Sequence, residues 1–228
     1  MTQRDGIGRE VGGGVQDSGT DKLGNKLVSE KEMASTILKL KNDKDPKGST
    51  FCLLQAKVKK AAKNSITLSW KKVPGALSYT VYGNKCGKKY KKLGTVTGTT
   101  FKYKKLKKGK YYKLLVVANG DGKALAVSKT IHTPTSGGEA GDYKSVTITS
   151  KKSITIAVGK TAKIKAKAVK KNKKLKVNSH RGLAYESDNP AVATVIGSCK
   201  IKAVGTGNCT IYVYAQNGVF AKVKVRVP

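Results

Sequence analysis

The sequence predicts an all-β protein with two β-sandwiches in series, preceded by a disordered leader and one short helix. One observation is the alternation of cations and apolar residues over 163–168 and 222–227. A period of two places the cations on one face of a strand and the apolar side chains on the other, so these strands are half-buried. The second observation is that apolar runs after residue 50 are short and end at Gly, Pro, Asn or Asp, without a helical period.

The N-terminal part divides into two predicted pieces. Residues 1–28 are rich in Gly and polar residues, and we expect a disordered leader. Residues 29–50 are expected to hold a short helix and a connector. Ser29-Glu30-Lys31-Glu32 has the form of a capping box, in which the Ser side chain caps the helix and the Glu bonds back. A helix over 30–41 would then place its apolar residues on one face, packed on the next domain: Met33, Ile37 and Leu40.

Residues 51–134 are predicted to form the first sandwich. Short runs bounded by turn residues, such as Pro74-Gly75 and Gly120-Asp121-Gly122, separate seven strands, and this spacing is typical of a β-sandwich. The strands are expected at 54–60, 65–71, 78–84, 89–96, 99–104, 110–119 and 124–132.

Two stretches of this domain resemble a fibronectin type III domain. The run from Ser69-Trp70 to Tyr82 is similar to strands B and C, and the run from Leu106 to Ala118 is similar to the E–F corner and strand F. The resemblance makes Trp70 and Tyr82 hallmark positions. It also implies that Tyr112 occupies the tyrosine corner, where the ring joins the core and the hydroxyl reaches the backbone.

Residues 135–144 are predicted to be a small-residue linker, and residues 145–228 a second sandwich that contains the alternating strand 162–169. Several motifs of this part resemble the bacterial immunoglobulin-like domain of group 2: Val158-Gly159-Lys160-Thr161, the run Tyr185 to Val195, Ala203 to Gly207 and Thr210 to Ala215. Tyr185 stands where that family usually has Trp. Both resemblances imply immunoglobulin-like sandwiches, in the arrangement of bacterial surface or secreted proteins.

The formal net charge of +34 lies entirely after residue 45, because residues 1–45 hold eight basic and eight acidic residues. Almost all of the cations are lysines, and arginine occurs only at four positions: Arg4, Arg9, Arg181 and Arg226. Lysine is a hydrated point charge, whereas Arg is favoured for bidentate reading of bases and phosphates. The simplest interpretation is a solvated surface, and the alternative is a site for a polyanion.

The candidate polyanion-binding residues are clustered lysines: Lys88, Lys89, Lys91, Lys92, Lys104, Lys105, Lys107, Lys108, Lys170, Lys171, Lys173 and Lys174. Aromatic residues between lysines could stack on sugars or bases, although most tyrosines on strands are expected to pack in the core or across strands. For the tyrosines near the lysine clusters, surface stacking on a ligand stays an alternative to core packing: Tyr82, Tyr90 and Tyr103.

Residues suited to catalysis are scarce. Residues 46–228 hold five acidic residues and two histidines, and the one cluster that suggests acid–base or metal chemistry is His180, Glu186 and Asp188. Asp188-Asn189-Pro190 is more simply a turn. We therefore predict no catalytic residue, no metal site, no cofactor and no enzymatic activity.

The four cysteines are Cys52, Cys86, Cys199 and Cys209. None belongs to a C-x-x-C pair, which argues against zinc. Buried free thiols are the expected state, and a local Cys199–Cys209 disulfide stays open at this point.

The resulting leading hypothesis is a monomeric, non-catalytic module pair on the bacterial cell surface or outside the cell, acting as a spacer, stalk or adhesion unit. One alternative is a module that binds a polyanion: an anionic polysaccharide or cell-envelope polymer, a glycosaminoglycan or, less favoured, nucleic acid. Another is a phage virion tail or decoration module, because Met1 to Asp5 lacks the apolar core of a secretory signal. No apolar run is long enough to cross a membrane.

Overall fold

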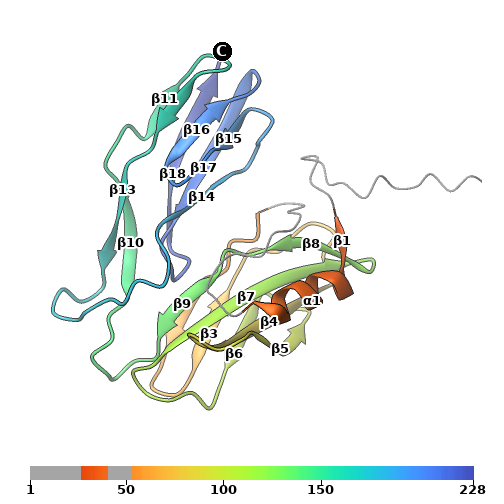
Figure 1. Cartoon of the computed structure of the whole chain (residues 1–228), viewed down its shortest axis with the longest axis vertical. Coiled ribbons are helices and arrows are strands. Elements are labelled where there is room, and N and C mark those ends of the chain that lie inside the picture. Colours follow the sequence, from red (N-terminus) through yellow and green to blue (C-terminus); the bar gives the residue numbers. More distant parts are fainter. Residues whose placement is uncertain (1–26, 41–52) are drawn as a thin grey trace, which may run out of the picture.

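The computed structural model describes residues 27–40 and 53–228, and within them it confirms the predicted all-β fold with one short helix. Two sandwiches, each with its own hydrophobic core, stand next to one another (Figure 1). Most of the predicted leader, the helix residue Lys41 and Cys52 lie outside the described residues.

The first sandwich contains two antiparallel sheets. One sheet has the order β2-β3-β6, and its strands are β2 (Lys57–Ala61), β3 (Ile66–Ser69) and β6 (Thr100–Tyr103). The other has the order β1-β8-β7-β4-β5, with β9 also paired to β7; its strands are β1 (Val28–Ser29), β4 (Ser78–Lys85), β5 (Lys91–Val96), β7 (Tyr111–Gly120), β8 (Lys123–Val127) and β9 (Ile131–Pro134).

The second sandwich is built from three hydrogen-bonded sets of strands. A four-stranded sheet has the order β11-β18-β17-β14, with β11 (Ser153–Thr155), β18 (Phe220–Val227), β17 (Gly207–Tyr214) and β14 (Ala184–Ser187). The remaining sets are β12-β16-β15 and β10-β13, with β10 (Tyr143–Ile148), β12 (Thr161–Lys163), β13 (Ala166–Lys170), β15 (Ala193–Val195) and β16 (Lys200–Ala203).

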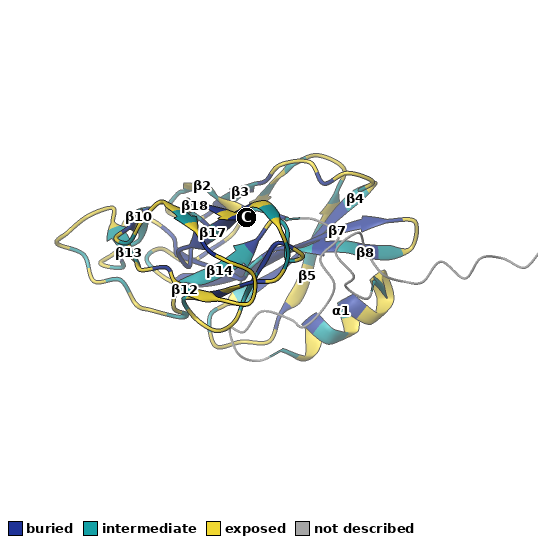
Figure 2. Ribbon diagram, turned by 90° about the horizontal axis from the view of Figure 1, so that it is seen from above, coloured by how far each residue is buried: buried dark blue, intermediate teal, exposed yellow. Residues whose placement is uncertain are grey.

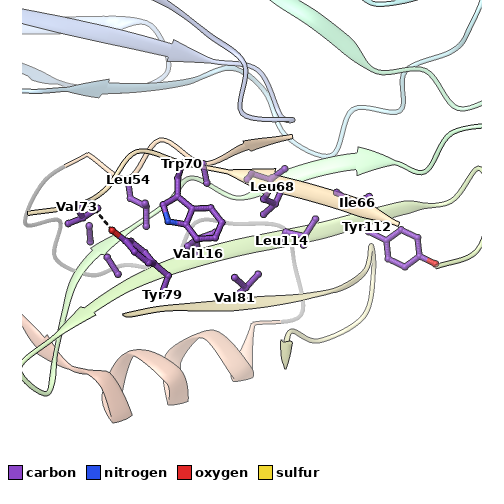
Figure 3. Packing of buried hydrophobic residues seen from close by; sticks show 14 of the residues in the cluster. Leu54, Ile66, Leu68, Trp70, Val73, Tyr79, Val81, Tyr112, Leu114 and Val116 are labelled. Carbon is purple, nitrogen blue, oxygen red and sulfur yellow. Dashed lines mark hydrogen bonds between the residues drawn. The ribbon is translucent and has the colours of Figure 1, made fainter. Parts of the chain in front are cut away.

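The core of the first sandwich contains the aromatic residues that the sequence singled out (Figure 3). The rings of Trp70 and Tyr79 lie 5.3 Å apart between centroids. The Tyr79 hydroxyl is also satisfied, because it accepts a 2.8 Å hydrogen bond from the backbone N–H of Val73. Tyr79 therefore fills the core with its ring and fixes the turn before β4 with its oxygen.

Tyr112 has the geometry of the tyrosine corner that the resemblance implied. Its ring is buried in the first core, and its hydroxyl accepts a 2.8 Å hydrogen bond from the backbone N–H of Lys107, five residues upstream. This bond fixes the loop between β6 and β7, where Lys105 adopts a left-handed backbone conformation with φ of 59°.

Replacing Tyr112 by Phe removes this bond and keeps the ring. We expect the free energy of unfolding to fall by about 1 kcal/mol, the usual contribution of one hydrogen bond. Tyr103→Phe is the matched control, because the Tyr103 ring contacts Tyr112 edge-on at 5.8 Å, and no hydrogen bond holds its hydroxyl among the described residues. Denaturant unfolding of the two variants should separate them; equal losses would contradict a role for the corner.

The seventh predicted strand, 124–132, is wrong as a single strand. The chain forms β8 and β9 instead, which pair with opposite ends of β7. Between them the Ser128 side chain accepts a 3.0 Å hydrogen bond from the backbone N–H of Val116 in β7. The strand breaks here because a side chain replaces the ladder bond, and β9 is thereby placed against the second sandwich.

The predicted strand 162–169 is also divided, although its alternation is confirmed. β12 pairs with β16, and β13 pairs with β10, so the chain changes partner strands at Ile164-Lys165. Ile164 and the valines of β18 are buried in the second core, whereas the lysines beside them are exposed. The lysine-rich strands therefore put their charge outside and their apolar residues inside, as a period of two requires.

Helix α1 (Glu30–Lys39) covers the outer face of the sheet that contains β4, β7 and β8. The Ser29 side chain accepts a 3.1 Å hydrogen bond from the backbone N–H of Glu32, as a capping box requires. The helix ends at Lys39, earlier than predicted, because Leu40 is already extended. Val28, predicted as leader, instead pairs with Ala124 at the edge of the sheet.

Candidate functional site

The described residues form a direct contact between the two sandwiches. From the first sandwich come β9 and the start of β2, and from the second comes the β17–β18 turn, 215–219. The backbone N–H of His132 donates to the carbonyl of Gln216 at 2.6 Å, and that of Val58 donates to the carbonyl of Asn217 at 3.1 Å. Backbone groups of two separate cores are thus paired with each other, which fixes the turn against the first sandwich.

Gly218 shows how closely the two surfaces approach. It has a positive φ of 87°, and a Cβ added to it would lie 2.3 Å from the carbonyl oxygen of Ala56. Only glycine tolerates both the left-handed backbone and this separation. The turn is therefore shaped to fit the first sandwich.

Arg181 joins the two sandwiches with one side chain. Its Nε donates to the carbonyl of Thr130 at 3.0 Å, in the first sandwich. Its Nη2 donates to the carbonyl of Ala215 at 3.0 Å and its Nη1 to the carbonyl of Gly182 at 2.9 Å, both in the second. Thr130 and Ala215 are buried, so the guanidinium satisfies acceptors that water does not reach easily.

Aromatic rings pack beside this contact. His132 of β9 and His180 of the second sandwich stack with centroids 5.3 Å apart and planes at 9°. Tyr111 at the start of β7 lies 4.8 Å from the His180 ring, and its hydroxyl accepts a 3.1 Å hydrogen bond from the backbone N–H of Asn178. The same hydroxyl donates to the carbonyl of Gly141. The two histidines therefore belong to a packed interface.

Asp142 ties the linker to both sandwiches. Its Oδ2 accepts a 2.8 Å hydrogen bond from the Thr133 hydroxyl in the first sandwich, and its Oδ1 accepts one of 2.8 Å from the backbone N–H of Tyr143 in the second. Burial raises the pKa of Asp142, against the lowering effects of these hydrogen bonds and of the positive charge of Lys171. The carboxylate is thus held by its partners at a desolvation cost.

The raised pKa of Asp142 predicts a pH effect with a definite sign. The folded state binds this proton more tightly than the unfolded chain, so the group's contribution to stability increases as pH falls from above the native pKa towards the unfolded one. Asp142→Asn removes that contribution. The unfolding free energy of the native protein minus that of Asp142→Asn should therefore be larger at about pH 4 than at about pH 7. A difference that is constant, or that shrinks on acidification, would rule out the raised pKa.

A groove of about 520 Å³ lies beside Asp142, where the linker meets both sandwiches. We call it the junction groove; its lining consists of Ala61, 134–138, Ala140, Asp142, 171–173 and Leu175. A Cβ added to Gly138 would lie 2.6 Å from the Cα of Gly109, so the linker runs tightly along the loop before β7. The volume falls within the range of ligand sites in proteins.

All twelve candidate lysines are exposed. The structure brings two of their three clusters together, because Lys108 of the 104–108 cluster packs beside Gly137 and Lys171 and Lys173 line the same groove. The 88–92 cluster divides. Lys88 and Lys89 lie in the β4–β5 turn near the start of β7, whereas Lys92 lies on β5 beside α1.

The three tyrosines near lysine clusters do not form surface platforms on which a ligand could stack. Tyr82 and Tyr90 are buried beneath α1 in a cluster with Met33 and Ile37, so they act as packing residues on the outer face of the sheet. Tyr103 is half-buried against the first core. Tyr82 therefore packs outside the first core, in the layer between the sheet and α1. The fourth hallmark position, Tyr185, packs against the second core, and its hydroxyl donates to the carbonyl of Ile164 at 3.3 Å.

The acid–base cluster suggested by the sequence separates in the structure. His180 lies in the junction, Glu186 accepts a 3.0 Å hydrogen bond from the Tyr214 hydroxyl, and Asp188 accepts one of 2.7 Å from the backbone N–H of Thr210. No group of three His, Cys, Asp or Glu side chains among residues 27–40 and 53–228 could hold a metal ion. Within the same ranges Cys199 and Cys209 are free thiols, and Cys209 is buried.

Comparison with known proteins identifies the second sandwich. Residues 142–226 match the family model of the bacterial Ig-like domain (group 2). In the first sandwich, the strand order β2-β3-β6 facing β8-β7-β4-β5 and the Tyr112 corner are those of a fibronectin type III domain. The chain is a tandem of a fibronectin type III-like domain and a bacterial Ig-like domain. Domains of these two kinds are generally non-catalytic, and the bacterial Ig-like domain typically occurs in surface or extracellular proteins.

Two similar solved structures are fibronectin type III domains. The domain of human fibronectin type III domain containing protein 3 is 22% identical, with 41% of this chain and 94% of that chain covered and a TM-score of 0.34. The fn3 domain of the human collagen alpha-1(XX) chain is 16% identical, with 37% and 83% covered and a TM-score of 0.33. No curated protein matches the chain.

Within the described part of the chain, no helix has the length and apolar character to span a membrane.

The residues of the junction could not be found from the sequence. Thr130, Arg181 and Ala215 are far apart in the chain and follow no period. One signal was present, since Arg181 is the one arginine between residues 10 and 225 of a lysine-rich chain. An isolated arginine in such a background indicates a position that needs a planar, multidentate donor.

Proposed function

We propose that this domain tandem is a non-catalytic, rigid spacer on the bacterial surface or outside the cell, where it holds an adhesive or binding unit at a fixed angle. The docked junction is the observation that carries the proposal. Two domains joined by a free linker would reorient, whereas these share buried backbone and side-chain hydrogen bonds. A spacer of this kind transmits position as well as distance.

The basic surface fits the same role. Cations on β18, Lys222, Lys224 and Arg226, are exposed, and the valines between them are buried. A surface of hydrated lysines keeps an extended module soluble and resists association with copies of itself. Many loop residues of both domains are exposed (Figure 2).

Accessibility on intact cells tests the proposed location. Cells that produce the full-length protein would be treated with a membrane-impermeant, lysine-reactive biotin reagent, and labelling of this tandem would be compared with that of a cytosolic marker. We expect strong labelling, since the candidate lysines are exposed. Labelling only after lysis would refute a surface location, and recovery with purified phage particles would support the virion module instead.

A further inference from the structure

We infer that the junction groove binds an acidic polysaccharide chain, and that it exists only while the two domains are docked. The inference rests on the proposed surface role and adds a site and a ligand class to it. It starts from the position of the linker, which runs between the loop before β7 of the fibronectin type III-like domain and the 171–175 turn of the bacterial Ig-like domain. In Figure 1, this loop, the linker and this turn lie on the same side of the molecule, at the left.

Positive charge borders the groove from both domains. A Cβ added to Gly137 would lie 3.3 Å from Lys63 Cγ and 3.4 Å from Lys108 Cδ, so both side chains of the first domain lie along the linker. Lys171 and Lys173 line the groove from the second domain. A concave surface with one sign of charge concentrates the field on a ligand of the opposite sign.

The surrounding loops strengthen this field. Residues 104–110 and 170–176 carry five lysines each, whereas the acids nearby are Glu139 and Asp142. Both oxygens of Asp142 accept hydrogen bonds from the protein itself, from Thr133 and Tyr143. The groove therefore presents an excess of cations to a ligand, with Asp142 as part of its base.

The lining favours a sugar polymer over nucleic acid. Proteins that bind single strands stack bases on aromatic side chains, and no aromatic residue is among the groove's described lining. Arginine, which reads bases and phosphates bidentately, is absent from it as well. The lining instead offers lysines with the hydroxyl of Ser136, the amide of Asn172 and backbone groups, which suit carboxylate or sulfate groups and sugar hydroxyls.

Each wall of the groove comes from a different domain, so binding must depend on docking. Gly218 gives a charge-neutral way to separate the walls, since a Cβ there would lie 2.3 Å from the carbonyl oxygen of Ala56 and 2.7 Å from the Cα of Lys57. Gly218→Ala should force the β17–β18 turn away from β2. The net charge and every lysine stay the same.

Binding of a sulfated heparin hexasaccharide to the whole chain, measured by calorimetry at physiological salt, tests the inference. The groove variant is Lys108→Glu/Lys171→Glu/Lys173→Glu, and the control with the same charge change is Lys163→Glu/Lys200→Glu/Lys202→Glu, on exposed positions of β12 and β16. We expect the groove variant to lose roughly tenfold or more in affinity and the control less than about threefold. Gly218→Ala should lose at least about fivefold, because one wall is displaced.

Three results would overturn the inference: no binding by the native chain, equal losses in the two triple variants, or unchanged binding by Gly218→Ala with an intact far-ultraviolet spectrum. A polyuronate oligosaccharide distinguishes a carboxylated from a sulfated polymer as the source, and neutral dextran should not bind. Tighter binding of an oligothymidine than of either acidic sugar would assign the groove to nucleic acid. Failure here leaves the cell-surface labelling result intact, so the two proposals fail separately.

Discussion

Arg181→Ala should release the two domains from each other. The substitution removes the hydrogen bond from Nε to the buried carbonyl of Thr130 across the junction, whereas the carbonyl of Ala215, in Arg181's own domain, keeps the backbone N–H of Gly218 as a donor. The loss of a partner for one buried acceptor costs about 1–3 kcal/mol, so docking should weaken by about 2 kcal/mol. Undocking is a local opening, and it should leave the two cores folded.

Hydrogen exchange measures this loss at two amides. The N–H groups of His132 and Val58 donate across the junction, so their protection reports docking. A loss of about 2 kcal/mol corresponds to roughly thirtyfold faster exchange there, while amides of β4 and β17 inside each core stay protected. Arg226→Ala is the matched control, because Arg226 is exposed on β18 and its removal changes the net charge equally. Equal exchange rates in both variants would show that Arg181 does not hold the junction.

Ile37→Asp should detach helix α1 from the fibronectin type III-like domain. Ile37 is fully buried among Met33, Tyr82, Leu115 and Val117. Truncating a buried Ile costs about 2–5 kcal/mol, and an unpaired carboxylate in the same place costs more, so the helix would leave the sheet. The domain would then lose about 3 kcal/mol or more of stability and expose an apolar sheet face.

Leu38→Asp is the control that distinguishes the loss of helix packing on the sheet from the effect of Asp on helix propensity. Leu38 follows Ile37 on the same helix, and 40% of its surface is exposed, so the same substitution should change stability by less than about 1 kcal/mol. The measurements are urea unfolding, binding of a dye that reports exposed apolar surface, and cleavage by trypsin within 27–40. If both variants bind the dye equally, the helix is not held by its buried face.

Local patterns predicted much of the fold. The Ser29 cap, the apolar face of α1, the alternating lysines of β18 and the Tyr112 corner all depend on residues within one element or one turn. Their spacing in the sequence is enough to predict them. The alternation over 163–168 and 222–227 also predicted correctly that Ile164 and the valines of β18 face the second core.

The predictions that were wrong depended on pairings distant in the sequence. The division between β8 and β9 follows from Ser128, whose side chain bonds to Val116 of another strand. The division between β12 and β13 arises because each half meets a different strand. Strand alternation looks the same whether a strand keeps or changes its partner, so the sequence could not reveal these breaks.

The sequence offered the lysines of the proposed groove as candidates but gave no indication of their arrangement. Exposed lysines were expected, yet their sequence clusters gave no sign that Lys108 would lie beside the linker at the groove that Lys171 and Lys173 line. That arrangement depends on the docking of two domains through Arg181 and Asp142, and neither residue forms part of a recognisable motif. Lysine-rich loops alone could not distinguish a shared groove from separate solvated surfaces.

Residual dipolar couplings of the native chain, weakly aligned in an uncharged medium, test the rigid junction most directly. If the domains dock as described, one alignment tensor fits the amides of β4 and β7 together with those of β17 and β18. Arg181→Ala should then require two tensors. Two tensors of different magnitude in the native chain would show that the domains reorient independently, and would contradict both the rigid spacer and the junction groove.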